Sequence, residues 1–161
     1  MGSVVIGISD MNVVKNGGSV ITYALGSCVG VALYDSVHHI AGLAHVLMPS
    51  SLDVHDGNIN VMKYVDTAVP ELVRRMEKAG ASLYYLSAKI AGGAQMFSLS
   101  GASAQFNIGD RNIEMARAIL EKLRIKIEAE DVGLNYGRTV EIFSDTGIYR
   151  IKAIAKGIKD I

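Results

Sequence analysis

Short apolar runs dominate the first fifty residues of the chain. They are dense in β-branched and aliphatic side chains and cover residues 4–8, 12–14, 20–24, 31–35 and 41–48. Such side chains favour extended backbone, and Asn16-Gly17-Gly18 supplies a turn that tolerates positive φ. The pattern therefore predicts five strands. We expect an exposed loop over residues 49–60, which are rich in Ser, Asp, Gly and Asn.

Two later segments show the periodicity of a helix. The first, residues 61–78, repeats apolar side chains on one face, and Gly80 follows it as a stop signal. Pro70 within this segment either kinks the helix or marks where its main part begins. The second segment, residues 110–124, opens at Asp110 as N-cap and carries one apolar stripe, made of Ile113, Ala116, Ile119, Leu120 and Leu123.

The rest of the chain is again extended in pattern. We expect a strand over residues 83–90 that leads to the glycine turn Ala91-Gly92-Gly93, and three further strands over residues 125–130, 139–144 and 148–153. Asp145-Thr146-Gly147 predicts a hairpin between the last two. Many strands with two helices indicate an α+β fold, in which helices flank mixed, largely antiparallel, sandwich-like sheets. A doubly wound fold would need regular strand–helix alternation, which is absent.

Composition narrows the class of protein. The chain has 161 residues, half of them hydrophobic, and neither a repeat nor a proline-rich linker, so we expect one domain over residues 1–161. No apolar run approaches the roughly 20 residues of a membrane span, and no secretory signal opens the chain, which predicts a cytoplasmic protein without membrane insertion. Sixteen basic residues balance sixteen acidic ones, which argues against nucleic acid as the main partner.

Cys28 is the single cysteine of the chain, and it lies in the run Leu25-Gly26-Ser27-Cys28-Val29-Gly30. A lone cysteine is most often a small buried hydrophobe, but two flanking glycines permit a sharp turn or a close approach to a substrate. His45, in the next apolar run, could serve as base for a thiolate nucleophile, and Thr22 could orient its imidazole. The alternatives for His45 and Thr22 are a core histidine and an ordinary strand residue.

Metal and cofactor chemistry find little support in the sequence. All four histidines lie between residues 38 and 55, but the adjacent His38 and His39 would diverge on a strand, and His-Glu-x-x-His is missing. One cysteine cannot build a multi-cysteine zinc site. His38, His39 and His55 are expected on surface loops. Gly92-Gly93 matches neither phosphate-binding glycine motif. We therefore expect neither a metal nor a cofactor.

Several short blocks, in order along nearly the whole chain, resemble the CheD family of chemoreceptor glutamine deamidases. The ordered set is far more specific than any single block. The blocks are Leu25-Gly26-Ser27-Cys28-Val29, Ala44-His45-Val46-Leu47-Met48-Pro49, Tyr64-Val65-Asp66-Thr67-Ala68, Lys89-Ile90-Ala91-Gly92-Gly93-Ala94-Gln95-Met96-Phe97, Asn107-Ile108-Gly109-Asp110-Arg111-Asn112, Glu130-Asp131-Val132-Gly133 and Gly137-Arg138.

The resemblance implies a Cys28, His45 and Thr22 triad that hydrolyses glutamine side chains of methyl-accepting chemoreceptors through a thioester. Candidates for the oxyanion hole or for substrate positioning are Ser27, Gly26 and Val29, beside the N–H of Cys28 itself. The family resembles the catalytic domain of cytotoxic necrotizing factor toxins. Leu134 stands where the family often has a second glycine, which puts the local turn in question.

The resemblance also implies a second partner, a CheC-type phosphatase. A monomer that forms heterocomplexes is the expected state. Two other functions stay open: a non-catalytic module that only regulates CheC, and a cysteine hydrolase of the same fold that acts on another amide.

Overall fold

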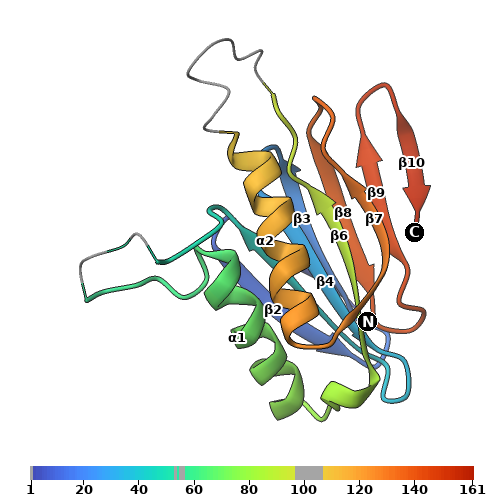
Figure 1. Cartoon of the computed structure of the whole chain (residues 1–161). Coiled ribbons are helices and arrows are strands. Elements are labelled where there is room, and N and C mark those ends of the chain that lie inside the picture. Colours follow the sequence, from blue (N-terminus) through green and yellow to red (C-terminus); the bar gives the residue numbers. More distant parts are fainter. Residues whose placement is uncertain (1, 53, 55–56, 97–106) are drawn as a thin grey trace.

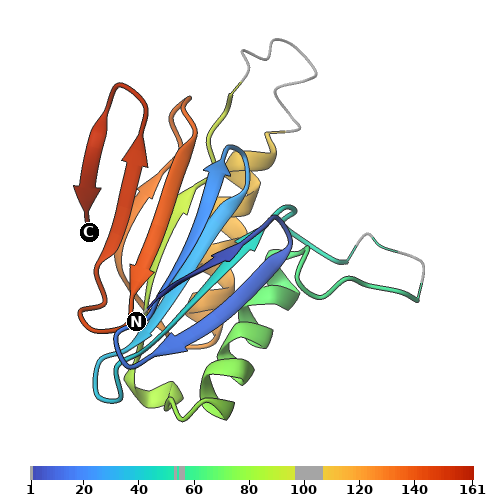
Figure 2. The same ribbon diagram turned by 180° about the vertical axis from the view of Figure 1, so that it is seen from behind.

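The structure, a computed structural model, describes residues 2–52, 54, 57–96 and 107–161. Figure 1 shows the helices on one side of the strands, and Figure 2 shows the opposite side, where strands alone form the surface. The elements in chain order are β1 (Ser3–Ile6), β2 (Asp10–Lys15), β3 (Ser19–Leu25), β4 (Val29–Asp35), β5 (Ile40–Val46), α1 (Val65–Lys78), the 3₁₀ turn η1 (Leu83–Tyr85), β6 (Leu86–Gly92), α2 (Ile108–Lys122), β7 (Lys126–Val132), β8 (Arg138–Phe143), β9 (Tyr149–Ala153) and β10 (Gly157–Asp160).

The strands form two five-stranded sheets. Sheet A has the order β1-β3-β8-β9-β10, and sheet B has the order β2-β5-β4-β6-β7. Each sheet contains one parallel pair, β1–β3 in sheet A and β6–β7 in sheet B. The other pairings are antiparallel. The expected α+β class with mixed, largely antiparallel sheets is therefore confirmed.

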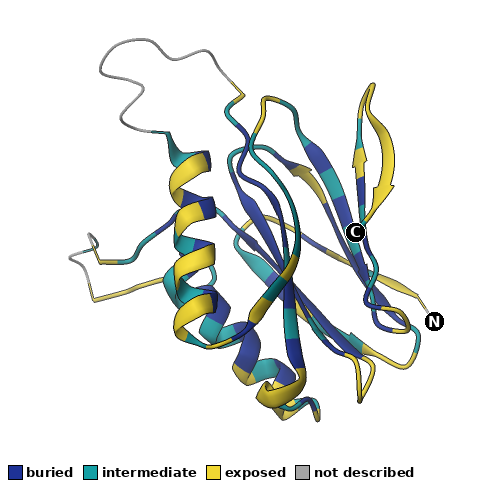
Figure 3. Cartoon of the chain, turned by 45° about the vertical axis from the view of Figure 1, so that its right-hand side comes forward, coloured by how far each residue is buried: buried dark blue, intermediate teal, exposed yellow. Residues whose placement is uncertain are grey.

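Sheet B lies between sheet A and the helices, and its strands β4 and β5 are buried on both faces, which explains their uninterrupted apolar runs. One core cluster joins its helix-facing side to α1 and α2, with Leu33, Leu72 and Leu120 fully buried. A second cluster fills the space between the sheets, with Leu43 from sheet B and Val140 from sheet A. In Figure 3, both helices turn a buried face inward and an exposed face outward.

Most strand predictions hold within one to three residues, but residues 83–90 differ. Leu83–Tyr85 form a 3₁₀ turn instead of the start of a strand, and the strand β6 runs on through Gly92. The side chain of Ser82 accepts a hydrogen bond from the N–H of Tyr84 at 3.3 Å, which stabilises the tight turn. The apolar Leu83, Tyr84 and Tyr85 had suggested a strand, but all three side chains are exposed.

The helix starts also differ from the prediction. α1 begins at Val65 rather than at residue 61, because the backbone before it bonds to Met48: Met48 N donates to Lys63 O, and Val65 N donates to Met48 O. Pro70 lies inside α1, so it does not mark the start. The N-cap of α2 is Asn107 rather than Asp110.

The Asn107 side chain accepts a hydrogen bond from the N–H of Asp110 at 3.1 Å, so the N-cap lies three residues before the predicted one and α2 starts at Ile108. The strand β10 was not predicted at all. It pairs antiparallel with β9, and its four residues are exposed, so it lacks the buried alternation by which a strand is recognised.

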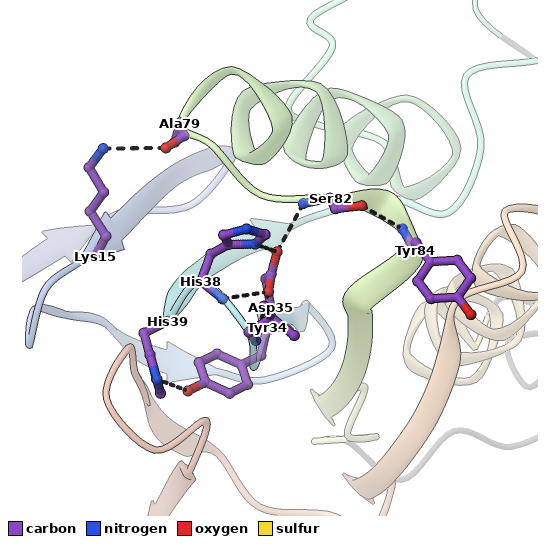
Figure 4. Close-up of polar contacts among 9 residues, drawn as sticks. Lys15, Tyr34, Asp35, His38, His39, Ala79, Ser82 and Tyr84 are labelled. Carbon is purple, nitrogen blue, oxygen red and sulfur yellow. Dashed lines mark hydrogen bonds and ion pairs between the residues drawn. The ribbon is translucent and has the colours of Figure 1, made fainter.

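A buried carboxylate orders the turn between β4 and β5 (Figure 4). The Asp35 side chain accepts hydrogen bonds from the backbone N–H groups of Val37, His38 and Ser82, and from Nδ1 of His38. Burial alone would raise the pKa of Asp35, but these hydrogen bonds together lower it. His38 and His39 are exposed in this turn, as expected; His55 lies outside the described residues.

Candidate active site

Thr22, His45 and Cys28 come from three different elements that meet between the two sheets. Thr22 lies on β3 of sheet A and His45 on β5 of sheet B. Cys28 lies in the short connection from β3 to β4, where the chain crosses from one sheet to the other. All three are buried: Thr22 is 0% exposed, His45 is 1% exposed and Cys28 is 6% exposed.

The His45 imidazole is held in one orientation by Thr22. Oγ1 of Thr22 lies 2.7 Å from Nδ1 of His45 and 3.0 Å from the carbonyl oxygen of Ile6. A carbonyl oxygen can only accept, so the single hydroxyl proton of Thr22 is donated to Ile6. Oγ1 must then accept from Nδ1–H of His45. This assignment places the free lone pair of the neutral imidazole on Nε2, which has no hydrogen-bond partner among the described residues.

Burial favours the neutral forms of both titratable groups. Desolvation lowers the pKa of His45 to about 4. Burial also raises the pKa of the Cys28 thiol, although its own backbone N–H acts in the opposite direction. Burial therefore favours a thiol with a neutral imidazole over a thiolate with an imidazolium. Such a histidine can accept a proton from the thiol during a reaction.

Strand register brings Cys28 and His45 to the same region. Gly30, two residues after Cys28, pairs directly with His45 across β4 and β5. The side chain of Tyr149 crosses from sheet A and donates a hydrogen bond to the Gly30 carbonyl at 3.0 Å. A Cβ at Gly30 would lie 2.5 Å from Oη of Tyr149, so only glycine fits there. Within the described residues, Cys28 Sγ and His45 Nε2 form no hydrogen bond with each other.

Two backbone hydrogen bonds from the glycine turn hold the turn that carries Cys28. Ala94 N donates to Gly26 O and Gly93 N donates to Cys28 O, both at 2.8 Å. A Cβ at Gly92 would lie 2.4 Å from Cys28 O, and Gly92 has a φ of +97°. Because Gly92 has no side chain, the backbone of the glycine turn can approach the backbone of the Cys28 turn closely.

The remaining predicted site residues have distinct places. Gly26 and Ser27 are half-buried in the turn before β4. Val29 is the first residue of β4, paired with Val46 and Gly92, and its side chain packs in the cluster that faces the helices.

Asn112 of α2 was not singled out from the sequence as a site residue. Its side chain reaches the Cys28 turn and donates to Ser27 O at 2.9 Å. It was detectable as a polar residue that shares a helix face with Ile113 and Ala116.

Within the described ranges, no three His, Cys, Asp or Glu side chains are grouped so that they could hold a metal ion. Neither α1 nor α2 has the length and apolar composition of a membrane-spanning helix, and the described residues contain no other candidate. The groove between α2 and β7, of about 640 Å³, is lined by other residues, including Arg117 and Glu130. It does not include Thr22, Cys28 or His45.

The sequence was compared with protein-family models and with known proteins to identify its family. A family model described as "CheD chemotactic sensory transduction" matches residues 47–153. Relatives named "Probable chemoreceptor glutamine deamidase CheD" from Lachnoclostridium phytofermentans, Caldanaerobacter subterraneus subsp. tengcongensis and Clostridium botulinum are each 45% identical over 156 residues. These alignments cover 97% of this chain and 96% of each relative. The chain therefore belongs to the CheD family.

Proposed function

We propose that this protein hydrolyses the side-chain amide of selected glutamines in methyl-accepting chemoreceptors, leaving glutamate. The names of its relatives support this substrate. The observation that carries the chemistry is the His45 imidazole. Its Nδ1–H is committed to Thr22, and its Nε2 is unpartnered among the described residues, in the inter-sheet layer that also holds the single cysteine.

Acylation follows from these roles. Sγ of Cys28 attacks the carboxamide carbon while Nε2 of His45 takes the thiol proton. Nε2 then gives this proton to the amide nitrogen of the tetrahedral intermediate, and the C–N bond breaks to release ammonia. The product of this half-reaction is a thioester between Cys28 and the receptor side chain. Thr22 accepts from Nδ1–H throughout, which stabilises the transient imidazolium.

Deacylation reverses the proton transfers. Nε2 accepts a proton from water as the water oxygen attacks the thioester carbon. The C–S bond then breaks, and Cys28 regains its proton from the imidazolium. The receptor gains one carboxylate per turnover. This changes the charge on its helix and creates a site that can accept a methyl group.

Both tetrahedral intermediates carry an oxyanion, for which the N–H groups of Cys28 and Ser27 are the proposed donors. In the described part of the chain, neither N–H donates to another backbone group. The carbonyl oxygens of Gly26 and Cys28 accept hydrogen bonds from the N–H groups of Ala94 and Gly93, respectively. Gly26 and Ser27 are half-buried, whereas the neighbouring Cys28 is buried. Gly26 and Ser27 are therefore the proposed contacts for the glutamine side chain of the substrate. Val29 offers only its backbone, which pairs with neighbouring strands.

A recessed thiol favours a long, flexible substrate side chain. Cys28 is only 6% exposed, so a substrate main chain on the surface would lie away from Sγ. A glutamine side chain can extend into the turn, which supports a side-chain amide over a peptide bond. We further propose, from the family resemblance, that a CheC-type phosphatase competes with the receptor for this protein. We also propose that the sandwich corresponds to the catalytic domain of cytotoxic necrotizing factor toxins.

Ammonia release from a purified receptor fragment tests the function. We expect release with the wild type and none above background with Cys28→Ala or His45→Ala. If wild type and Cys28→Ala release equal ammonia, the deamidase proposal fails. A pull-down of a CheC-type phosphatase that survives Cys28→Ala, together with an inactive wild type, would then favour the regulatory module. Release of ammonia from other amides only would favour a hydrolase with a different substrate.

A further inference from the structure

Asn112 connects α2 to the turn that carries Cys28. Its side chain is fully buried, and Nδ2 donates to the carbonyl of Ser27 at 2.9 Å and to the carbonyl of Leu47 at 3.1 Å. Because both partners can only accept, the amide must present its NH₂ group to them. Oδ1 has no hydrogen-bond partner in the part of the chain that the structure describes. The amide is therefore used as a pair of donors.

The bond to Ser27 orients the peptide group that precedes the nucleophile. In a trans peptide, the C=O of Ser27 and the N–H of Cys28 lie in one plane and point in opposite directions. Holding the Ser27 oxygen toward α2 therefore directs the Cys28 N–H away from α2. The Cys28 N–H acts on its own thiol in the direction that lowers the thiol pKa. An oxyanion formed after attack by Sγ would lie beside Cys28, and this N–H is its proposed donor.

Three consecutive carbonyls around the nucleophile are each held by one donor. Gly26 O is held by Ala94 N, Ser27 O by Asn112 Nδ2 and Cys28 O by Gly93 N. The first and third donors are backbone groups. The middle one is the only side chain among them, so a substitution at Asn112 releases one of these three carbonyls and leaves the other two bonds in place.

The second bond of Asn112 reaches the element that carries the base. Leu47 follows His45 by two residues, immediately after β5. One amide group therefore joins the turn of the nucleophile to the end of the strand that holds the imidazole. α2 sits firmly on this region, because a Cβ at Gly109 would lie 2.5 Å from the carbonyl oxygen of Gly93.

We propose that Asn112 is a positioning residue for deamidation, which holds the Ser27–Cys28 peptide group so that the Cys28 N–H can donate to the oxyanion. The proposal deepens the proposed function and rests on it for the reaction. The effect of Asn112 on the Cys28 thiol can be tested without any receptor. This separates a failure of the positioning role from a failure of the deamidase assignment.

The test compares Asn112→Ala with Asn107→Ala. Asn107 is the N-cap of the same helix, and among the described residues it has no hydrogen bond to residues 26–28. Its side chain bonds to Asp110 and to Gln95, so its substitution reports loss of the helix cap and of the Gln95 contact without loss of a bond to the Cys28 turn. Three quantities are measured for each variant: the thermal midpoint, kcat and KM on a receptor fragment, and the pH dependence of alkylation by iodoacetamide. Cys28 is the single cysteine, so the alkylation signal is specific to it.

For Asn112→Ala we expect kcat to fall about 10- to 100-fold with KM within about threefold of wild type, as for a displaced oxyanion donor. The midpoint of Cys28 alkylation should move to higher pH, because the thiolate loses an oriented N–H donor. Asn107→Ala should lower the thermal midpoint but should change neither kcat nor the alkylation midpoint. If Asn112→Ala does not fold, Asn112→Ser is measured in the same way.

The alkylation midpoint decides each outcome. A folded Asn112 variant with the wild-type alkylation midpoint overturns the proposal, whatever its kcat. A midpoint shift that Asn107→Ala shares equally also overturns it, because the effect would then come from the stability of α2. If wild type deamidates no receptor glutamine, the proposed function fails. A midpoint shift specific to Asn112 would still support its role in positioning Cys28.

Discussion

The hydroxyl of Thr22 accepts the Nδ1 proton of His45 and donates its own proton to the carbonyl of Ile6. This chain of two hydrogen bonds begins on sheet B and ends on β1 of sheet A. It links the two sheets through Thr22 on β3, the strand that precedes Cys28 in the chain. The partner of the imidazole is a neutral hydroxyl and not a carboxylate, which agrees with the low pKa of His45.

Replacing Thr22 by valine keeps the shape of the side chain and removes the hydroxyl. Nδ1–H of His45 and the Ile6 carbonyl then lose their partner in a buried site, which should cost about 1–3 kcal/mol of stability. We expect kcat to fall about 10- to 100-fold, because the imidazole is no longer held in one tautomer. This loss is only part of what a general base contributes to the rate. Nitrogen NMR of His45 should show the Nδ1–H tautomer in wild type and a mixture in the variant. Thr22→Ser, which retains the hydroxyl, should restore most of the activity.

The pH dependence of stability should reveal the buried His45. Its pKa is lowered by burial from 6.5 to about 4, so the unfolded chain binds a proton that the folded chain excludes between these values. The stability contribution of neutral His45 is therefore complete above pH 6.5 and is lost as the pH falls toward 4. The full loss is about 3 kcal/mol.

This loss can be isolated by comparing wild type with His45→Gln at pH 6.5 and pH 4.5 in urea unfolding. Asp35 and Glu71 also have lowered pKa values, so their contributions are lost only as the pH falls through the usual range of carboxyl groups and below. Wild type should lose about 2–3 kcal/mol more than the variant over this interval. Equal losses in the two proteins would show that His45 titrates normally in the folded state.

Gly30 and Tyr149 should behave as a coupled pair. Gly30→Ala places a Cβ against Oη of Tyr149, at 2.5 Å before any relaxation, and should destabilise the protein by about 1–3 kcal/mol. Tyr149→Phe removes the hydrogen bond to the Gly30 carbonyl and should cost about 1 kcal/mol. The double variant lacks the clashing oxygen. Denaturant unfolding should therefore show it to be at least about 1 kcal/mol more stable than the sum of the single losses predicts; additive losses would contradict this packing.

Leu134 should be a site where glycine stabilises the protein. Its φ is +62°, a left-handed conformation that is unfavourable for leucine, and its side chain is 65% exposed. Leu134→Gly should raise the free energy of unfolding by about 0.5–1 kcal/mol. Leu134→Ala is the matched control, since alanine retains the Cβ and the strain. A glycine variant no more stable than the alanine variant would contradict this expectation.

Much of the fold followed from local pattern. β-branched runs located the strands of the first half, and helical periodicity located α1 and α2, because burial on one or two faces leaves a period in the sequence. The pairing of β1 with β3 could not be predicted, since a parallel pair depends on contacts between distant residues. The exposed β10 lacks a buried face, and the turn at Leu83 was obscured by apolar side chains that prove to be exposed.

The candidate site followed in part from residue types. Cys28, His45 and Thr22 were selected from the sequence, and the structure brings Thr22 and His45 into a direct hydrogen bond. The acceptor role of the Ile6 carbonyl has no signal in the sequence, because backbone groups are the same at every position. The sequence did indicate Asn112 as a polar residue on a buried helix face. Its hydrogen-bond partners, Ser27 and Leu47, are distant in sequence, so only the packing of α2 identifies them.

The proposed mechanism requires a thioester between Cys28 and a receptor glutamine. The most direct measurement is mass spectrometry of digested reaction mixtures that are quenched with acid during turnover. We expect a receptor peptide joined to Cys28 through a glutamine side chain that has lost ammonia. This adduct should disappear on treatment with hydroxylamine and be absent from Cys28→Ala. Conversion of glutamine to glutamate at an undiminished rate in Cys28→Ala, with no adduct on wild-type Cys28, would contradict it.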